Sequence, residues 1–119
     1  MIQKGSQIGT IDKCNVWIIN TFHIYRGFRH KVAKFGSFLR VSIRKTRPKA
    51  WIKKGKKSKA IFLRSCFKKI KKDGSYIKFK TNNAVLLKKR LTPRGRELEG
   101  PIFYGLKRKK FNSSFASII

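Results

Sequence analysis

Acidic residues are nearly absent from this sequence. Its 119 residues include 32 Lys and Arg but only four Asp and Glu, which gives a formal net charge of +28. Asp12, Asp73, Glu97 and Glu99 are too few and too widely separated to predict the paired carboxylates of a metal-dependent nuclease. They also cannot neutralise the cations, and a net charge of this size opposes the compact state unless a polyanion binds. The composition predicts a partner that carries many phosphates.

Cysteine and histidine are scarce as well. Cys14 and Cys66 lie far apart, which argues against a disulfide framework or a zinc site with closely spaced ligands and fits a reducing compartment. His23 and His30 fit packing or phosphate contact better than the roles of a catalytic base and its helper. We therefore predict no catalytic residue, no metal site and no cofactor.

Long apolar segments are missing too. The longest apolar runs, near residues 16–19, 60–63 and 84–87, have the length of a strand, well below the roughly 18 residues of a membrane-spanning helix. The opening stretch MIQKGSQIGTIDKCNVW has neither the order of a secretory signal nor the Arg-rich, acid-free pattern of a transit peptide. We expect no membrane partner and no targeting segment at this end.

Two segments in the first half of the chain read as strands. Residues 16–25 are rich in β-branched and aromatic residues with apolar groups at both parities, as in a strand covered on both sides. Residues 38–44 alternate instead, with Leu39, Val41 and Ile43 on one face and polar residues on the other. The second segment predicts a half-buried strand with a cationic outer face.

The middle of the chain predicts another strand, a hairpin and a last short strand. In residues 59–67, Ile61, Leu63 and Phe67 are expected to point inward, opposite to Phe62, Arg64 and Cys66. Asp73-Gly74 is a strong signal for a tight hairpin turn, because Asp tolerates and Gly freely adopts the required backbone angles. After the turn, an apolar face alternates with a charged face: Ile77 and Phe79 against Tyr76, Lys78 and Lys80. The last strand covers residues 84–87.

Short strands at close spacing predict a mainly β protein, a small barrel or sandwich, of which we favour the β-barrel. After Pro93, Gly and Pro break the pattern, and only the last residues fit a short helix, with Phe111, Phe115 and Ile118 forming one apolar stripe. No linker or repeat divides the chain. We expect a single domain over residues 1–119, with the barrel over roughly 1–90 and a loop and short helical tail over roughly 91–119.

Basic residues form four clusters: 53–59, 68–72, 88–90 and 107–110. One such cluster is usually a solvated face. Four basic clusters with almost no acidic residues to neutralise them predict a nucleic-acid partner. We expect phosphate contacts from Lys53, Lys54, Arg64, Lys68, Lys69, Lys71, Lys72 and Lys78, and from a second set of Arg40, Arg44, Lys88 and Lys89.

Aromatic residues are interleaved with these cations and fit stacking on unpaired bases. They are Tyr25, Phe35, Phe38, Trp51, Tyr76 and Phe79. A core position is the better interpretation for Phe79, whereas Trp51 and Tyr76 beside basic runs suit contact with RNA.

Several motifs in a fixed order carry a resemblance to a known family. They are Met1-Ile2-Gln3, Lys53-Lys54-Gly55 with Lys59-Ala60, Asp73-Gly74-Ser75-Tyr76-Ile77-Lys78-Phe79, Asn83-Ala84-Val85-Leu86-Leu87, and Gly100-Pro101. Along nearly its whole length the chain resembles the large-subunit ribosomal protein numbered fourteen in the universal scheme. It departs from that family at Asp12-Lys13-Cys14-Asn15-Val16, at Ser37, and at Glu97-Leu98-Glu99 before the Gly-Pro pair.

The resemblance implies a five-stranded β-barrel with a projecting β-hairpin and a small C-terminal helical region. It implies binding to large-subunit ribosomal RNA on the face that meets the small subunit. It further implies contacts with the large-subunit proteins numbered three and nineteen, with small-subunit ribosomal RNA at an intersubunit bridge, and with a ribosome-silencing factor. We therefore predict a structural constituent of the large subunit that supports translation and performs no reaction.

Compartment and function each leave an alternative open. The chain is more basic and richer in Phe and Ile than ordinary bacterial members of the family, which favours a protein made inside an organelle. We expect a mitochondrion, and the alternatives are a plastid and the cytoplasm of an AT-rich bacterium. The alternative function is a free-standing cationic RNA chaperone or single-strand RNA-binding barrel, and a small nuclease ranks third.

Overall fold

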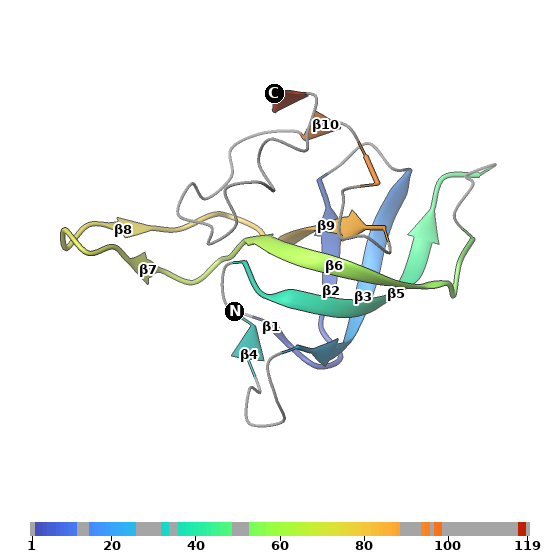
Figure 1. Cartoon of the computed structure of the whole chain (residues 1–119), viewed down its shortest axis with the longest axis horizontal. Helices are drawn as coiled ribbons and strands as arrows, with labels where there is room; N and C mark the ends of the chain where they lie inside the picture. Colours follow the sequence, from blue (N-terminus) through green and yellow to red (C-terminus); the bar gives the residue numbers. More distant parts are fainter. Residues whose placement is uncertain are drawn as a thin grey trace.

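The computed structural model describes residues 2–11, 15–25, 32–33, 36–48, 53–88, 94–95, 97–98 and 117–118. Within these ranges the chain forms strands and turns and no helix (Figure 1). The strands are β1 (Ile2–Gln3), β2 (Gln7–Thr10), β3 (Val16–Ile24), β4 (Val32–Ala33), β5 (Phe38–Thr46), β6 (Lys57–Arg64), β7 (Lys69–Ile70), β8 (Tyr76–Ile77), β9 (Asn83–Leu87), β10 (Glu97–Leu98) and β11 (Ser117–Ile118).

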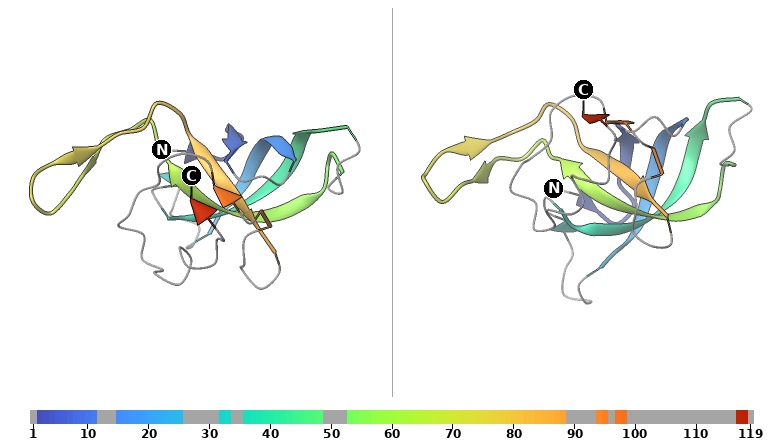
Figure 2. Two further views of the ribbon diagram at one scale, coloured as in Figure 1. Left: turned by 90° about the horizontal axis from the view of Figure 1, so that it is seen from above. Right: turned by 45° about the horizontal axis from the view of Figure 1, so that its top comes forward.

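Five of these strands form a closed barrel in the order β2-β3-β5-β6-β9 (Figures 1 and 2). Neighbouring strands are antiparallel except β2 and β9, which pair in parallel and close the barrel at Gly9↔Asn83 and Thr10↔Ala84. The approach there is tight, because a Cβ on Gly9 would lie 3.0 Å from Oδ1 of Asn83. Closure leaves the barrel without a free sheet edge. The predicted mainly β, five-stranded barrel is confirmed.

Aliphatic side chains from all five strands fill the barrel interior. Leu39, Val41 and Ile43 of β5 are fully buried, which confirms the alternation expected in this segment. Among the described residues, Phe62 is the largest fully buried side chain. The interior cluster consists of Ile8, Val16, Ile19, Ile24, Leu39, Val41, Ile43, Ala60, Phe62, Ala84 and Leu86.

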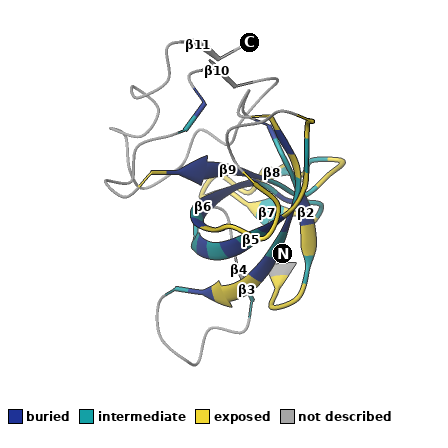
Figure 3. Ribbon diagram, turned by 90° about the vertical axis from the view of Figure 1, so that its right-hand side faces the viewer, coloured by how far each residue is buried: buried dark blue, intermediate teal, exposed yellow. Residues whose placement is uncertain are grey.

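Two expectations about strand faces are wrong. β3 is not covered on both sides, since Trp17 and Phe22 are 46% and 40% exposed on its outer face. Both faces of β6 are instead buried over residues 60–63, where Phe62 packs inside the barrel and Ile61 and Leu63 pack outside it. The alternation separated these two faces correctly but did not show that both are covered, as they are in β9 too (Figure 3). Lys57 and Lys59, at the start of β6, remain at least partly exposed. Phe67, expected inward, lies beyond the end of β6 and is 57% exposed.

The outer cluster of β6 and β9 anchors the base of the hairpin. It contains Ile11, Ile61, Leu63, Val85 and Leu87, with Phe38, Ile77 and Phe79 packed against it. The Phe79 N–H donates to the Ser65 carbonyl oxygen (3.0 Å), and the Cys66 N–H donates to Oδ1 of Asn82 (2.9 Å). Phe79 therefore has the packing position expected of it, and the hairpin leaves the barrel from a fixed base.

Two small sheets complete the described part of the structure. β1 pairs antiparallel with β4, and β10 pairs in parallel with β11. Ser117 and Ile118 are thus in a strand. Ile118, expected on the apolar stripe of a short C-terminal helix, is therefore in β11. The rest of that expected helix, including Phe111 and Phe115, falls on residues outside the described ranges.

Replacing Phe62 with Ala should lower the free energy of unfolding by about 3–5 kcal/mol, because it removes the largest side chain of the interior and leaves a cavity. Urea unfolding followed by circular dichroism measures this. Phe67→Ala is the matched control and should change stability far less, since Phe67 is exposed. Equal losses for the two variants would contradict this description of the core.

Candidate nucleic-acid interface

The hairpin formed by β7 and β8 extends away from the barrel (Figures 1 and 2). Its strands pair at Lys69↔Ile77 and Ile70↔Tyr76. At the tip, the Gly74 N–H donates to the Lys71 carbonyl oxygen (3.1 Å), and the Lys71 N–H donates to the Ser75 carbonyl oxygen (2.7 Å). Lys72, Asp73 and Gly74 therefore form the connecting loop, and Gly74 adopts φ +87°. Such a loop requires a residue with positive φ at its end, which explains the glycine.

Asp73 holds this loop in shape. Its Oδ1 accepts hydrogen bonds from the Ser75 N–H (3.1 Å) and from the Ser75 hydroxyl (2.6 Å). These bonds, the hydroxyl bond first, lower the pKa of the fully exposed Asp73 carboxyl below its ordinary value, and the nearby Lys71 adds to the effect. Asp73 and Gly74 thus lie in the loop at the tip of the hairpin, where these hydrogen bonds and the positive φ of Gly74 are found.

The hairpin and the residues flanking its strands carry five of the twelve predicted phosphate contacts. Lys68, Lys71, Lys72, Lys78 and Lys80 are exposed, and Lys69 is half-buried. The Lys68 Nζ lies 4.5 Å from the centroid of the Tyr76 ring. Tyr76 and Ile70, which face each other across the ribbon, are 60% and 75% exposed. The ribbon thus presents cations around an exposed ring.

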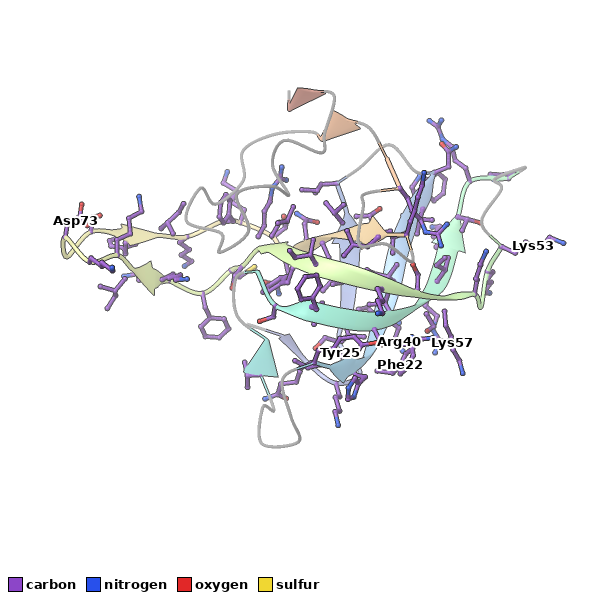
Figure 4. The ribbon with its side chains drawn as sticks, in the orientation of Figure 1. Phe22, Tyr25, Arg40, Lys53, Lys57 and Asp73 are labelled. Atoms are coloured by element: carbon purple, nitrogen blue, oxygen red, sulfur yellow. The ribbon has the colours of Figure 1, made fainter. Side chains whose placement is uncertain are left out.

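A second group of cations lies on the outer face of the barrel, opposite the interior side chains of β3, β5 and β6. Strand pairing places His23 beside Arg40 and Arg40 beside Lys59. Phe22 and Tyr25 lie close by, with Lys57 Nζ 5.9 Å from the Phe22 ring centroid and Lys59 Nζ 5.7 Å from that of Tyr25. We call this group the barrel patch: Phe22, His23, Tyr25, Arg40, Lys57 and Lys59. Figure 4 labels four of them, Phe22, Tyr25, Arg40 and Lys57, which lie near one another in that view.

The turn before β6 presents a third group. Lys53, Lys54 and Lys56 are exposed, and the turn is fixed by a hydrogen bond from the Gly55 N–H to the Ile43 carbonyl oxygen (2.7 Å). Gly55 has φ +86°, which accounts for a glycine at this point. Lys53 lies at the opposite end of the molecule from Asp73 (Figure 4). The predicted contacts are therefore spread over more than one surface.

The remaining predicted residues are scattered. Arg44 is exposed on the outer face of β5, Arg64 is half-buried at the end of β6, and Lys88 is exposed just after β9. Lys89 lies outside the described residues, as do the aromatic candidates Phe35 and Trp51. Phe38 packs against the outer cluster rather than presenting a free ring.

Sequence analysis missed the barrel patch as a unit. The sequence marks Arg40 as a candidate and places Lys57 and Lys59 in the basic cluster 53–59 and Tyr25 among the aromatic residues, but it predicts that Phe22 lies in a strand covered on both sides. The available signal was the alternation of the 38–44 segment, which gave Arg40 an outward direction. The register of β3 and β6 against β5, which gathers the six residues, has no counterpart in local patterning.

Nothing in the described parts of the chain suggests a metal centre, since no three His, Cys, Asp or Glu residues gather there. Those same parts hold no helix long and apolar enough to span a membrane.

Comparison with known proteins adds two findings. The model of a family described as ribosomal protein L14p/L23e matches residues 1–118. The chain is 50% identical over 120 residues to the large ribosomal subunit protein uL14m of Tetrahymena pyriformis, with 100% of each chain covered.

Replacing Gly74 with Val should weaken the hairpin by about 1–2 kcal/mol, because a β-branched residue is strained at φ +87° even though a Cβ there meets no atom within 4 Å. Hydrogen exchange at the Lys71 N–H should become roughly 5- to 30-fold faster. Gly74→Asn is the control, since Asn tolerates this conformation better. Equal exchange in the two variants would refute the assigned role of the turn.

The hairpin tip should lose order on acidification. Because the folded-state pKa of Asp73 is depressed, the stabilising contribution is present above the ordinary value of 3.8 and is lost as the pH falls through the lower, folded-state pKa. The Ser75 amide chemical shift, followed by NMR, should therefore titrate with a midpoint below 3.8. Asp73→Asn should abolish this titration. A midpoint above 3.8 would show that the two hydrogen bonds do not form.

Proposed function

The chain belongs to the ribosomal protein L14p/L23e family, and on this basis we propose that it is a structural component of the large ribosomal subunit that binds ribosomal RNA. We further propose that residues 1–119 act as one ribosomal-protein domain. Its role is to place cations at fixed positions between packed RNA segments, and we propose no reaction for it.

The observation that carries the RNA-binding proposal is the cationic hairpin. Lys68, Lys71, Lys72 and Lys78 are exposed along a ribbon whose base is packed on the barrel. The carboxylate at its tip, Asp73, is engaged by Ser75 in shaping the loop. Cations gathered on such a ribbon repel one another until phosphates neutralise them, and neutralisation releases counterions from the RNA.

The rigid barrel determines where these cations act. Hydrogen bonds and packing at Ser65, Cys66 and Phe79 fix the direction in which the hairpin leaves the barrel. Phosphate contacts of this kind position a protein on RNA without reading its sequence. We propose that other basic residues supply further phosphate contacts. They are Lys53 and Lys54 in the turn before β6, Arg40 and Arg44 on β5, Arg64 at the end of β6, half-buried Lys69, and Lys88 with Lys89.

The location proposed is the ribosome of a mitochondrion. The similarity to a uL14m protein supports this, because that name denotes the mitochondrial form. We also propose that the gene lies in the organelle. Family resemblance supports, as further proposals, contacts with the large-subunit proteins numbered three and nineteen, a place at the intersubunit bridge with small-subunit RNA, and docking of a ribosome-silencing factor.

Replacing Lys68, Lys71 and Lys72 together with Gln should lower the salt dependence of RNA binding. If each lysine contacts one phosphate, the slope of log K against log salt should fall in magnitude by about 2. Fluorescence anisotropy of the full chain with a single-stranded large-subunit RNA fragment measures this.

The matched control replaces Lys4, Lys45 and Arg47 with Gln, which removes the same charge from exposed positions that we do not assign to RNA contact. If this control lowers the slope as much as the hairpin variant does, the attraction is diffuse and the hairpin has no special role.

Co-sedimentation with large subunits through high-salt sucrose distinguishes the proposed function from the alternative of a free RNA chaperone. A ribosomal component should stay bound to the subunit, whereas a chaperone should be removed by the salt.

A further inference from the structure

We propose that the barrel patch is a stacking site for unpaired nucleotides of RNA, with Phe22 and Tyr25 as the platforms. This inference rests on the proposed function and names a surface within it. In this proposal the barrel patch contacts RNA bases, while the hairpin and the turn before β6 contact phosphates.

Strand register builds the patch from three strands. His23 of β3 pairs with Arg40 of β5, which pairs with Lys59 of β6. One step along the barrel, Asn20 pairs with Ser42, which pairs with Lys57. Each row therefore ends in a lysine and runs through hydrogen-bonding side chains, and neither row contains a carboxylate.

The aromatic rings lie next to these rows. Phe22 is 40% exposed, although burial of a large aromatic side chain would stabilise the fold. The Tyr25 ring packs edge-on against the His23 ring, with centroids 5.0 Å apart and planes at 88°. The backbone N–H of Tyr25 donates to the Phe38 carbonyl oxygen (3.1 Å). Tyr25 is thus held in place, while Phe22 presents a ring to the surface. Rings held on a sheet in this way are suited to stacking on bases.

Lys57 and Lys59, which lie beside the rings, also suit the binding of an unpaired nucleotide. Lys57 Nζ lies 5.9 Å from the Phe22 centroid and Lys59 Nζ 5.7 Å from the Tyr25 centroid. A lysine side chain is long and flexible, so its ammonium can leave the ring for a phosphate when a base stacks there. A nucleotide supplies both groups at once, the base for the ring and the phosphate for the cation.

A protein partner fits the patch less well. The core of a protein–protein interface is depleted in charge and needs contiguous apolar surface. Here Lys57 Nζ and Lys59 Nζ lie within 5.9 Å and 5.7 Å of the Phe22 and Tyr25 ring centroids, and Arg40 pairs with Lys59, so the surface around the rings is charged. Cations around separate rings match unpaired RNA, whose charge is of the opposite sign and whose bases are flat.

The test compares two probes of equal charge and length, oligo(U) and an abasic ribose-phosphate oligomer, in binding to the full chain. Wild type should bind oligo(U) more tightly than the abasic probe. Phe22→Leu keeps an apolar side chain but removes the ring, so it should bind oligo(U) on the order of tenfold more weakly and leave abasic binding and the salt slope unchanged. Circular dichroism verifies that the variant is folded.

Trp17→Leu is the matched control. Trp17 is also an exposed ring on β3 beside a lysine, with Lys45 Nζ 5.4 Å from its centroid, but it lies outside the patch. It should leave the preference for oligo(U) intact. The proposal is overturned if wild type shows no preference for bases, if Phe22→Leu weakens both probes equally, or if Trp17→Leu removes the preference as fully as Phe22→Leu does.

Ultraviolet cross-linking of intact large subunits gives a second measurement that does not depend on folding of variants. RNA adducts on the peptide containing Phe22 and Tyr25 support the proposal. Adducts on hairpin peptides alone, or cross-links from the patch to a protein, would overturn it while leaving the proposed function in place. Absence of the chain from salt-washed large subunits would instead refute the proposed function.

Discussion

Packing of aliphatic side chains inside the closed barrel holds together a chain whose surface charges repel one another. The interior is sealed by pairing between β2 and β9, where Gly9 allows the strands to approach closely. On β6 and β9 a second apolar cluster covers the outside as well. Burial on this scale opposes the self-repulsion of a net charge of +28 and lets exposed turns hold cations at fixed positions.

Local patterning predicted much of this fold. Alternation placed Leu39, Val41 and Ile43 inside, and Asp73-Gly74 lies in the turn between β7 and β8. Patterning failed where tertiary context decides which faces are covered. Phe62 and its neighbours on β6 are buried on both faces, whereas Phe22 of β3 remains exposed, and no period within one strand distinguishes these cases.

The candidate interface was predicted where its residues are contiguous in sequence and missed where they are not. The hairpin lysines from Lys68 to Lys78 follow one another along the chain, so their clustering could be read directly. The barrel patch depends on the register of three strands, which brings His23, Arg40 and Lys59 into one row. A shift of one residue in any pairing would turn these side chains to the other face, and register is a property of the assembled barrel.

We propose that the folded barrel holds cations and rings against RNA. A density map of the large ribosomal subunit that contains this chain, at a resolution that shows side chains, is the decisive test. RNA phosphates should lie against the hairpin lysines, and an unpaired base should lie over Phe22. A map in which the hairpin projects into solvent, or in which both surfaces pack only against protein, would contradict it.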